Sequence, residues 1–155
     1  MKHLQPDTLI HNPIGTRVTS TVDLPADPRS VWKIVGDFAG FSAFIPALSL
    51  TEMTGEGIGS VRKKLFKDGN VVIEQLNSRD DSQLCMTWTL IHTSLPVGSL
   101  WAAMHVEDLP QDNSRAVWTI VAEPSALYLA DLPGFEGFLQ GFADGAMANV
   151  KTLFS

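Results

Sequence analysis

The chain has 155 residues and a mass of 16.9 kDa, the usual size of one domain with one hydrophobic core. Apolar residues make up 45% of the chain and charged residues 18%, which excludes a disordered or fibrous protein. The net charge is −6, from 17 acidic and 11 basic residues without a long basic run, and this argues against nucleic acid or an anionic membrane as a partner.

Residues 1–15 read as an N-terminal tail and residues 16–155 as a single domain, because no repeat or linker divides the rest of the chain. The tail carries His, Pro, Asp and Asn where a signal peptide needs an apolar core, and no window holds eighteen uninterrupted apolar residues. The single cysteine, Cys85, allows no intramolecular disulfide and no cysteine-rich metal cluster. We therefore expect a cytoplasmic protein with no membrane span, no metal and no cofactor.

The first periodic segment, TRVTSTVDL at residues 16–24, alternates apolar and polar side chains as a half-buried strand does. Asp27 and Pro28 then form a helix start, because aspartate caps a helix and proline suits its first position. A helix over about 28–38 follows, and Pro46 limits the next segment to a short second helix or a turn.

From Leu48 to Glu123 the sequence alternates strand and turn patterns. The Asp68-Gly69 pair stands between two apolar runs and indicates a hairpin, since this turn needs residues that tolerate positive φ. After Pro133 the period becomes helical up to the end of the chain. The predicted architecture is therefore one antiparallel sheet against which a long C-terminal helix buries its apolar stripe.

Five segments in this order resemble the polyketide cyclase/dehydrase and lipid-transport family. It belongs to the START-like (SRPBCC) superfamily, which also contains the plant abscisic acid receptors. The resemblance implies an α+β helix-grip fold: a seven-stranded curved antiparallel sheet around a long C-terminal helix, with two short helices after the first strand and a ligand cavity between sheet and helix. The segments are PADPRSVWKIVGDFAGFSAFIPAL (25–48), GEGIGSVRK (55–63), DGNVVIEQL (68–76) with Asp80 and Asp81, SLPV (94–97) and VWTIVAE (117–123).

Strand alternation, taken with this resemblance, predicts which side chains face the cavity. Glu74 stands where a glutamate faces the ligand in the abscisic acid receptors, and alternation places Trp118 on the opposite face. Most of the predicted lining is apolar, as small-molecule pockets are. The predicted lining consists of Arg62, Lys64, Phe66, Val72, Glu74, Met86, Trp88, Leu90, Leu100, Ala102, Met104, Thr119, Val121, Glu123, Phe142, Ala146 and Val150.

Lys64 and Glu74 are the candidate catalytic pair, because buried ionisable groups with shifted pKa values can donate and accept protons. The alternative is a salt-bridge network of Arg62, Lys64, Glu74 and Glu123 that only positions strands. A one-residue slip in strand 60–66 would place Lys63 inside instead of Lys64, because both registers of this strand are mixed.

Three functions fit the sequence. The first is binding of a small hydrophobic molecule that is polyketide-like, aromatic or lipid-like, by a monomer or a homodimer. The second is a cyclase, dehydratase or lyase that uses Lys64 and Glu74 as acid and base. The third is a protein-interaction or stress-response module, for which an exposed Trp101 would be the surface clue. Ile45 replaces the anchoring lysine of the abscisic acid receptors, which argues against a hormone receptor.

Overall fold

The computed structural model describes residues 15–155, and the fold below is that of these residues. Their secondary structure follows the predicted order of one strand, two short helices, six strands and a long helix, with one further 3-10 helix between the last strand and the long helix. The elements are β1 (Thr16–Leu24), α1 (Pro28–Val35), η1 (Phe41–Ala43), β2 (Leu48–Thr54), β3 (Val61–Phe66), β4 (Val71–Asp80), β5 (Cys85–Thr93), β6 (Val97–Leu109), β7 (Asn113–Pro124), η2 (Ala126–Tyr128) and α2 (Leu132–Leu153).

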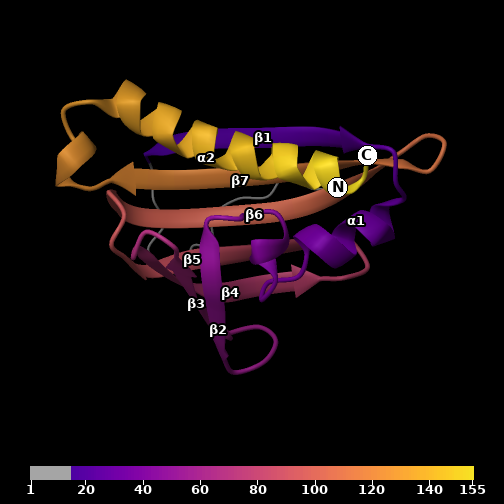
Figure 1. Ribbon diagram of the computed structural model, residues 1–155, viewed down its shortest axis with the longest axis horizontal. Coiled ribbons are helices and arrows are strands. Elements are labelled where there is room, and N and C mark those ends of the chain that lie inside the picture. The colour runs from indigo at the N-terminus through magenta and orange to yellow at the C-terminus, as the bar shows by residue number, and fades with distance from the viewer. Residues whose placement is uncertain (1–14) are drawn as a thin grey trace.

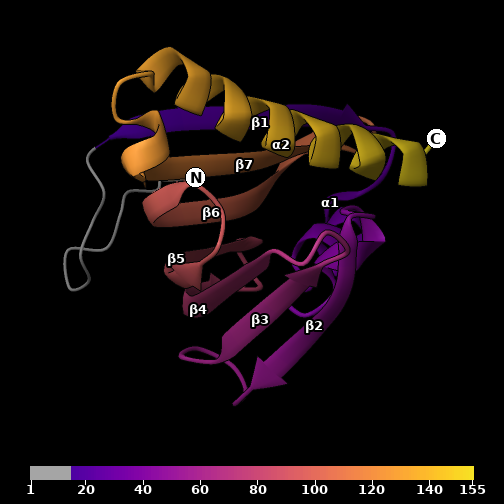
Figure 2. The same ribbon diagram turned by 60° about the vertical axis from the view of Figure 1, so that its left-hand side comes forward.

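The seven strands form one antiparallel sheet in the order β1-β7-β6-β5-β4-β3-β2. Its strands turn steeply from β1 to β2, so the sheet curls, and α2 lies along β1 and β7 on its concave face (Figures 1 and 2). Strong twist of this kind lets one sheet wrap a helix. The predicted helix-grip fold is confirmed.

Local sequence signals explain where the two α-helices begin. The Asp27 carboxylate accepts a hydrogen bond from the backbone N–H of Ser30 at the start of α1, and Asp131 accepts one from Gly134 at the start of α2. Helix α1 ends at Val35, earlier than the predicted residue 38, because Gly36 closes its last turn. No helix within residues 15–155 is long and apolar enough to cross a membrane.

The concave face of the sheet has two parts. Phe41 and Phe44 of the η1 region pack into one part, together with the inner residues Met86 and Met104, and all four are fully buried. Phe41 stands at the boundary, with its ring centroid 5.7 Å from that of Trp88 and 5.9 Å from that of Trp118. The other part, under the N-terminal half of α2, is not filled.

Candidate functional site

A cavity occupies this unfilled part of the concave face. It offers about 60 Å³ to the centre of a water-sized sphere, which is room for a few water molecules. Its walls come from β3 to β7, the loop after β5, and α2. The lining consists of Lys64, Phe66, Val72, Glu74, Trp88, Leu95, Val97, Leu100, Ala102, Trp118, Ile120, Phe138, Leu139 and Phe142.

The lining is half-exposed at one end of the cavity and buried at the other. Leu95, Leu100, Phe138 and Phe142 are partly accessible and therefore mark the mouth. The floor is buried, and it holds both of the ionisable lining residues among those described, Lys64 and Glu74, each 3% exposed. The mouth is therefore apolar and the charge lies at depth.

Glu74 is the centre of a buried ion cluster with Arg62 and Lys64. Its Oε1 accepts a hydrogen bond from Arg62 Nε at 2.9 Å and lies 2.8 Å from Arg62 Nη2 and 3.0 Å from Lys64 Nζ. The pairing of β3 with β4 sets Arg62 directly opposite Glu74, while Lys64 lies two residues along on the same face. All three side chains therefore meet without a loop.

The arginine of this cluster belongs to the wall behind the cavity. Its guanidinium carbon lies 3.9 Å from the ring centre of Phe38 and 4.1 Å from that of Phe41, and Nη1 donates to the carbonyl oxygen of Phe38 at 2.8 Å. Arg62 is fully buried and is absent from the cavity lining. It therefore holds Glu74 in place from behind.

The surroundings shift the pKa values of both floor residues. Burial lowers the pKa of Lys64 to about 8, against the opposing charge of Glu74. Burial alone would raise the pKa of Glu74, but the charges of Lys64 and Arg62 outweigh it and hold that pKa below its usual value. At neutral pH the cluster therefore contains two cations and one carboxylate.

Lys64 is the inward lysine of β3, since its side chain is 4% exposed and Lys63 is exposed. The other predicted lining residues divide into two groups. Those that the cavity brings together are Lys64, Glu74, Phe66, Val72, Trp88, Leu100, Ala102 and Phe142. Those that lie elsewhere are Arg62, Met86, Leu90, Met104, Thr119, Val121, Glu123, Ala146 and Val150.

Several of the predicted residues that do not line the cavity still lie on the concave side of the sheet, in its filled part. Met86 and Met104 pair across β5 and β6 in the filled part of the concave face, and Ala146 and Val150 lie on the C-terminal half of α2. Leu90 packs half-buried against the core. The predicted cavity was too long, because the residues packed around Phe41 and Phe44 fill one end of the groove.

The predicted register of β7 was wrong. Trp118 and Ile120 face inward and line the cavity, paired with Met104 and Ala102. Thr119, Val121 and Glu123 alternate with them and therefore lie on the outer face. Both faces of this strand are largely buried, so hydrophobic alternation gave no contrast from which to choose.

Trp101 is not exposed, contrary to the sequence prediction. Its exposed fraction is 1%, and it packs with Ala103 and Val121 in a small cluster on the outer face of the sheet. The interaction-module hypothesis therefore loses its surface clue.

Four further lining residues of the cavity are missing from the lining predicted from the sequence. Leu95 and Val97 were placed in the SLPV segment without a role, yet they line the cavity beside Leu100. Phe138 and Leu139 lie on the apolar stripe of the last helix, one turn before the predicted Phe142. That stripe was the available signal for both helix residues.

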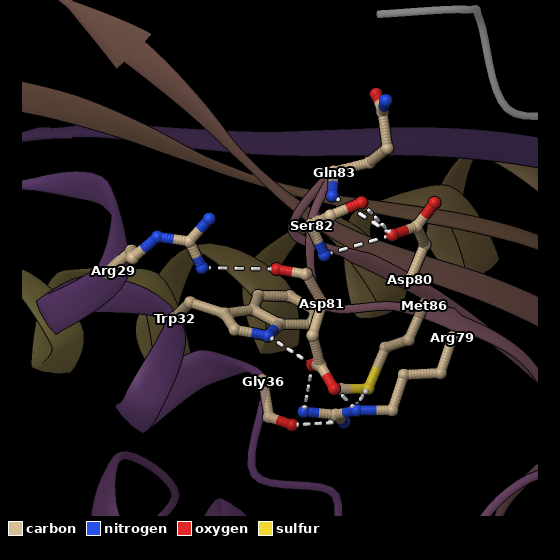
Figure 3. A network of polar contacts seen from close by, with 9 residues as sticks. All are labelled: Arg29, Trp32, Gly36, Arg79, Asp80, Asp81, Ser82, Gln83 and Met86. Carbon is tan, nitrogen blue, oxygen red and sulfur yellow. Dashed lines mark hydrogen bonds and ion pairs between the residues drawn. The ribbon is translucent and has the colours of Figure 1, made fainter.

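A second polar cluster lies at the end of β4, outside the cavity (Figure 3). The Asp81 carboxylate accepts hydrogen bonds from Trp32 Nε1 at 2.8 Å and from Arg79 Nε at 2.9 Å. Arg79 also donates to the carbonyl oxygen of Gly36, and Arg29 donates to that of Asp81 at 3.3 Å. This cluster fastens α1 to the sheet, which is a structural task.

Within residues 15–155, no group of three or more His, Cys, Asp or Glu residues is arranged to hold a metal ion. The candidate site is the cavity with its charged floor.

Comparisons with known proteins identify a family and solved structures of similar fold. The family model for polyketide cyclase / dehydrase and lipid transport matches residues 15–155. The solved structure of XoxI from Bacillus cereus is 19% identical, with a TM-score of 0.80 over 89% of this chain and 94% of that one. The Zhui aromatase/cyclase from Streptomyces sp. R1128 is 16% identical, with a TM-score of 0.68 over 87% and 93%. A comparison with curated proteins gives no significant match.

Proposed function

The chain belongs to the polyketide cyclase/dehydrase and lipid transport family, and on that premise we propose that it binds a small, largely apolar molecule in the cavity between the sheet and α2. The observation that carries this proposal is the cavity itself, whose apolar mouth leads to a buried polar floor. Ligand pockets commonly combine an apolar wall with a few polar groups that fix orientation.

The size of the cavity limits how a guest enters. At about 60 Å³ it is far smaller than the roughly 300–1,000 Å³ of typical ligand pockets. Phe138 and Phe142 are partly exposed at the mouth, and their rings contact those of Tyr128 and Trp118, so a rotamer change of either ring exchanges these contacts for contacts with the guest. A guest larger than a few water molecules therefore binds by moving these two rings.

A thermal-shift screen with apolar small molecules tests binding, because a ligand that binds the native state raises the melting temperature. The variant Ala102→Leu adds bulk to the cavity floor, where Ala102 is 1% exposed. We expect it to abolish the shifts seen with the wild-type protein, while Ala148→Leu on the exposed side of α2 keeps them. Ligands that shift wild type and Ala102→Leu equally would contradict binding in this cavity.

A second candidate function is acid/base catalysis, which the contact of Lys64 with Glu74 beside the cavity supports. An ammonium with a pKa of about 8 can donate a hydrogen bond or a proton to a carbonyl oxygen near neutral pH. Glu74 is a weak base, because its pKa is lowered and its Oε1 already contacts two cations. Catalysis ranks second for this reason.

Exchange of the α-protons of an apolar ketone, 2-tetralone, for deuterium tests this candidate by NMR. If the site catalyses enolisation, wild type and Lys63→Met accelerate the exchange, whereas Lys64→Met and Glu74→Gln do not. Equal exchange rates in all four proteins would count against catalysis and leave binding as the function.

A further inference from the structure

The buried ion cluster carries one positive charge more than it neutralises. Arg62 and Lys64 share the carboxylate of Glu74, and among residues 15–155 no other carboxylate contacts either cation. All three side chains are at most 4% exposed, so water screens this excess poorly. An uncompensated buried charge is costly unless a partner of opposite charge pairs with it.

The excess charge reaches the cavity through Lys64. Arg62 is held by Glu74, by the Phe38 carbonyl and by two aromatic rings behind the wall. An ammonium has three N–H donors, and in the described part of the chain Lys64 Nζ has one hydrogen-bonding partner, Glu74 Oε1 at 3.0 Å. Beyond Glu74, Nζ lies 5.8 Å from the centre of the Phe41 ring, and two of its donors have no acceptor in residues 15–155.

Lys64 is the one cation among the described lining residues of the cavity. The other described lining residues except Glu74 are apolar or aromatic, and the indole Nε1 of Trp118, which is buried without a hydrogen-bond partner, is a neutral donor. A guest with one charged end and an apolar body would thus have a single orientation, with its charged end at the floor. Lys64 is already buried in the free protein, so an anion that binds it does not have to supply the free energy of removing the ammonium from water. This favours an ion pair between the guest and Lys64.

We infer that the guest carries an oxyanion, such as a carboxylate, that binds Lys64 Nζ at the cavity floor while its apolar body fills the space toward Phe142. This inference rests on the proposed function and names the chemical class of its ligand. The cluster has room for one such group, because a single anion neutralises its excess of one positive charge.

Matched pairs of apolar carboxylates and their primary amides test the inference, from benzoate and benzamide to 2-naphthoate and 2-naphthamide. Each pair differs in charge and hardly in shape. In isothermal titration at pH 7 we expect wild type to bind the acids about 10- to 100-fold more tightly than the amides, as for hydrogen bonds to charged groups. Lys64→Met should lose this preference and keep its affinity for the amides.

Lys63→Met is the matched control, since Lys63 is the exposed neighbour on the same strand and should leave the preference intact. Lys64→Gln repeats the test if the methionine variant does not fold. Wild type alone offers a third measurement: between pH 7 and 9.5 the preference for acids should decline as Lys64 loses its proton. Of the described groups facing Lys64, only Arg62 and Glu74 are ionisable, and both keep their charge over this range.

The outcomes separate the inference from the proposed function. If acids and amides bind wild type equally well, or if Lys64→Met keeps the preference, the inference is overturned and cavity binding stands. If neither member of any pair binds, cavity binding fails, and the inference fails with it.

Discussion

Strand β4 takes part in two arginine–carboxylate clusters that differ in burial and in charge balance. In the middle of the strand, Glu74 holds Arg62 and Lys64 in full burial with one positive charge in excess. At its end, Arg79 and Asp81 pair one to one, with Asp81 65% exposed. Both arginines lie over aromatic rings, 3.9 Å from Phe38 for Arg62 and 5.1 Å from Trp32 for Arg79.

The comparison distinguishes a cluster that only stabilises the fold, around Asp81, from a cluster that can also bind a ligand, around Glu74. The cluster around Asp81 is balanced and touches solvent, so its parts have little left to offer a ligand. The cluster around Glu74 is unbalanced, buried and open to a cavity. Four measurements can break or sharpen this contrast.

The largest effect is expected for Glu74→Gln. It removes the one negative charge between two buried cations, and breaking a buried ion pair costs about 3–5 kcal/mol of unfolding free energy. Urea denaturation at pH 7 measures this loss. A loss below about 1 kcal/mol would mean that water reaches the cluster and that the two clusters are alike.

The next effect is the contribution of Lys64 to the dependence of stability on pH. Burial lowers the pKa of Lys64 to about 8, while the unfolded chain keeps its proton up to about 10.5. Between these values the unfolded state binds more protons, so the unfolding free energy rises with pH, by on the order of a few kcal/mol in total.

Subtracting the stability curve of Lys64→Met from that of the wild type isolates this rise. The Lys63→Met curve should run parallel to the wild type over the same range. A flat difference between wild type and Lys64→Met would show that the ammonium is solvated in the native state.

Asp81→Asn is expected to cost about 1 kcal/mol, because asparagine can still accept the hydrogen bond from Trp32 Nε1 but loses the charge opposite Arg79. Thermal unfolding in low and high salt measures the change. A cost as large as that of Glu74→Gln would remove the distinction between the clusters.

The smallest effect is expected for Arg29→Ala, at less than about 0.5 kcal/mol. Arg29 is exposed and makes a long 3.3 Å hydrogen bond to the Asp81 carbonyl oxygen. The same denaturation assay measures it. A larger loss would indicate that α1 depends on this contact for its attachment.

The sequence was informative where one face of an element is polar. Alternation in β1 and the helical stripe of α2 predicted both elements and, with the family resemblance, the helix-grip fold. In β3 both faces carry polar and charged residues, so the sequence did not decide whether Lys63 or Lys64 faces inward. The pairing with β4 decides between them by setting Arg62 opposite Glu74 and leaving Lys63 outside.

The sequence was uninformative where both faces are buried. Strand β7 runs Val117 to Ala122 without an exposed residue, so its inward set is fixed only by pairing with β1 and β6. The length of the cavity could not be read either. The length of the cavity depends on Phe41 and Phe44 of the η1 region, which fill one part of the concave face of the sheet. The periodicity of α2 gives no information about that contact.

The tryptophans of the cavity floor have a practical consequence. Trp88 and Trp118 line the cavity with ring centroids 6.3 Å apart, while Trp32 and Trp101 lie outside it. Indole emission responds to the polarity and charge of its surroundings, so a guest that displaces water beside the first pair alters the light the protein emits. The other two tryptophans contribute a constant background, and the protein thus carries an optical reporter of its own occupancy, readable without a label.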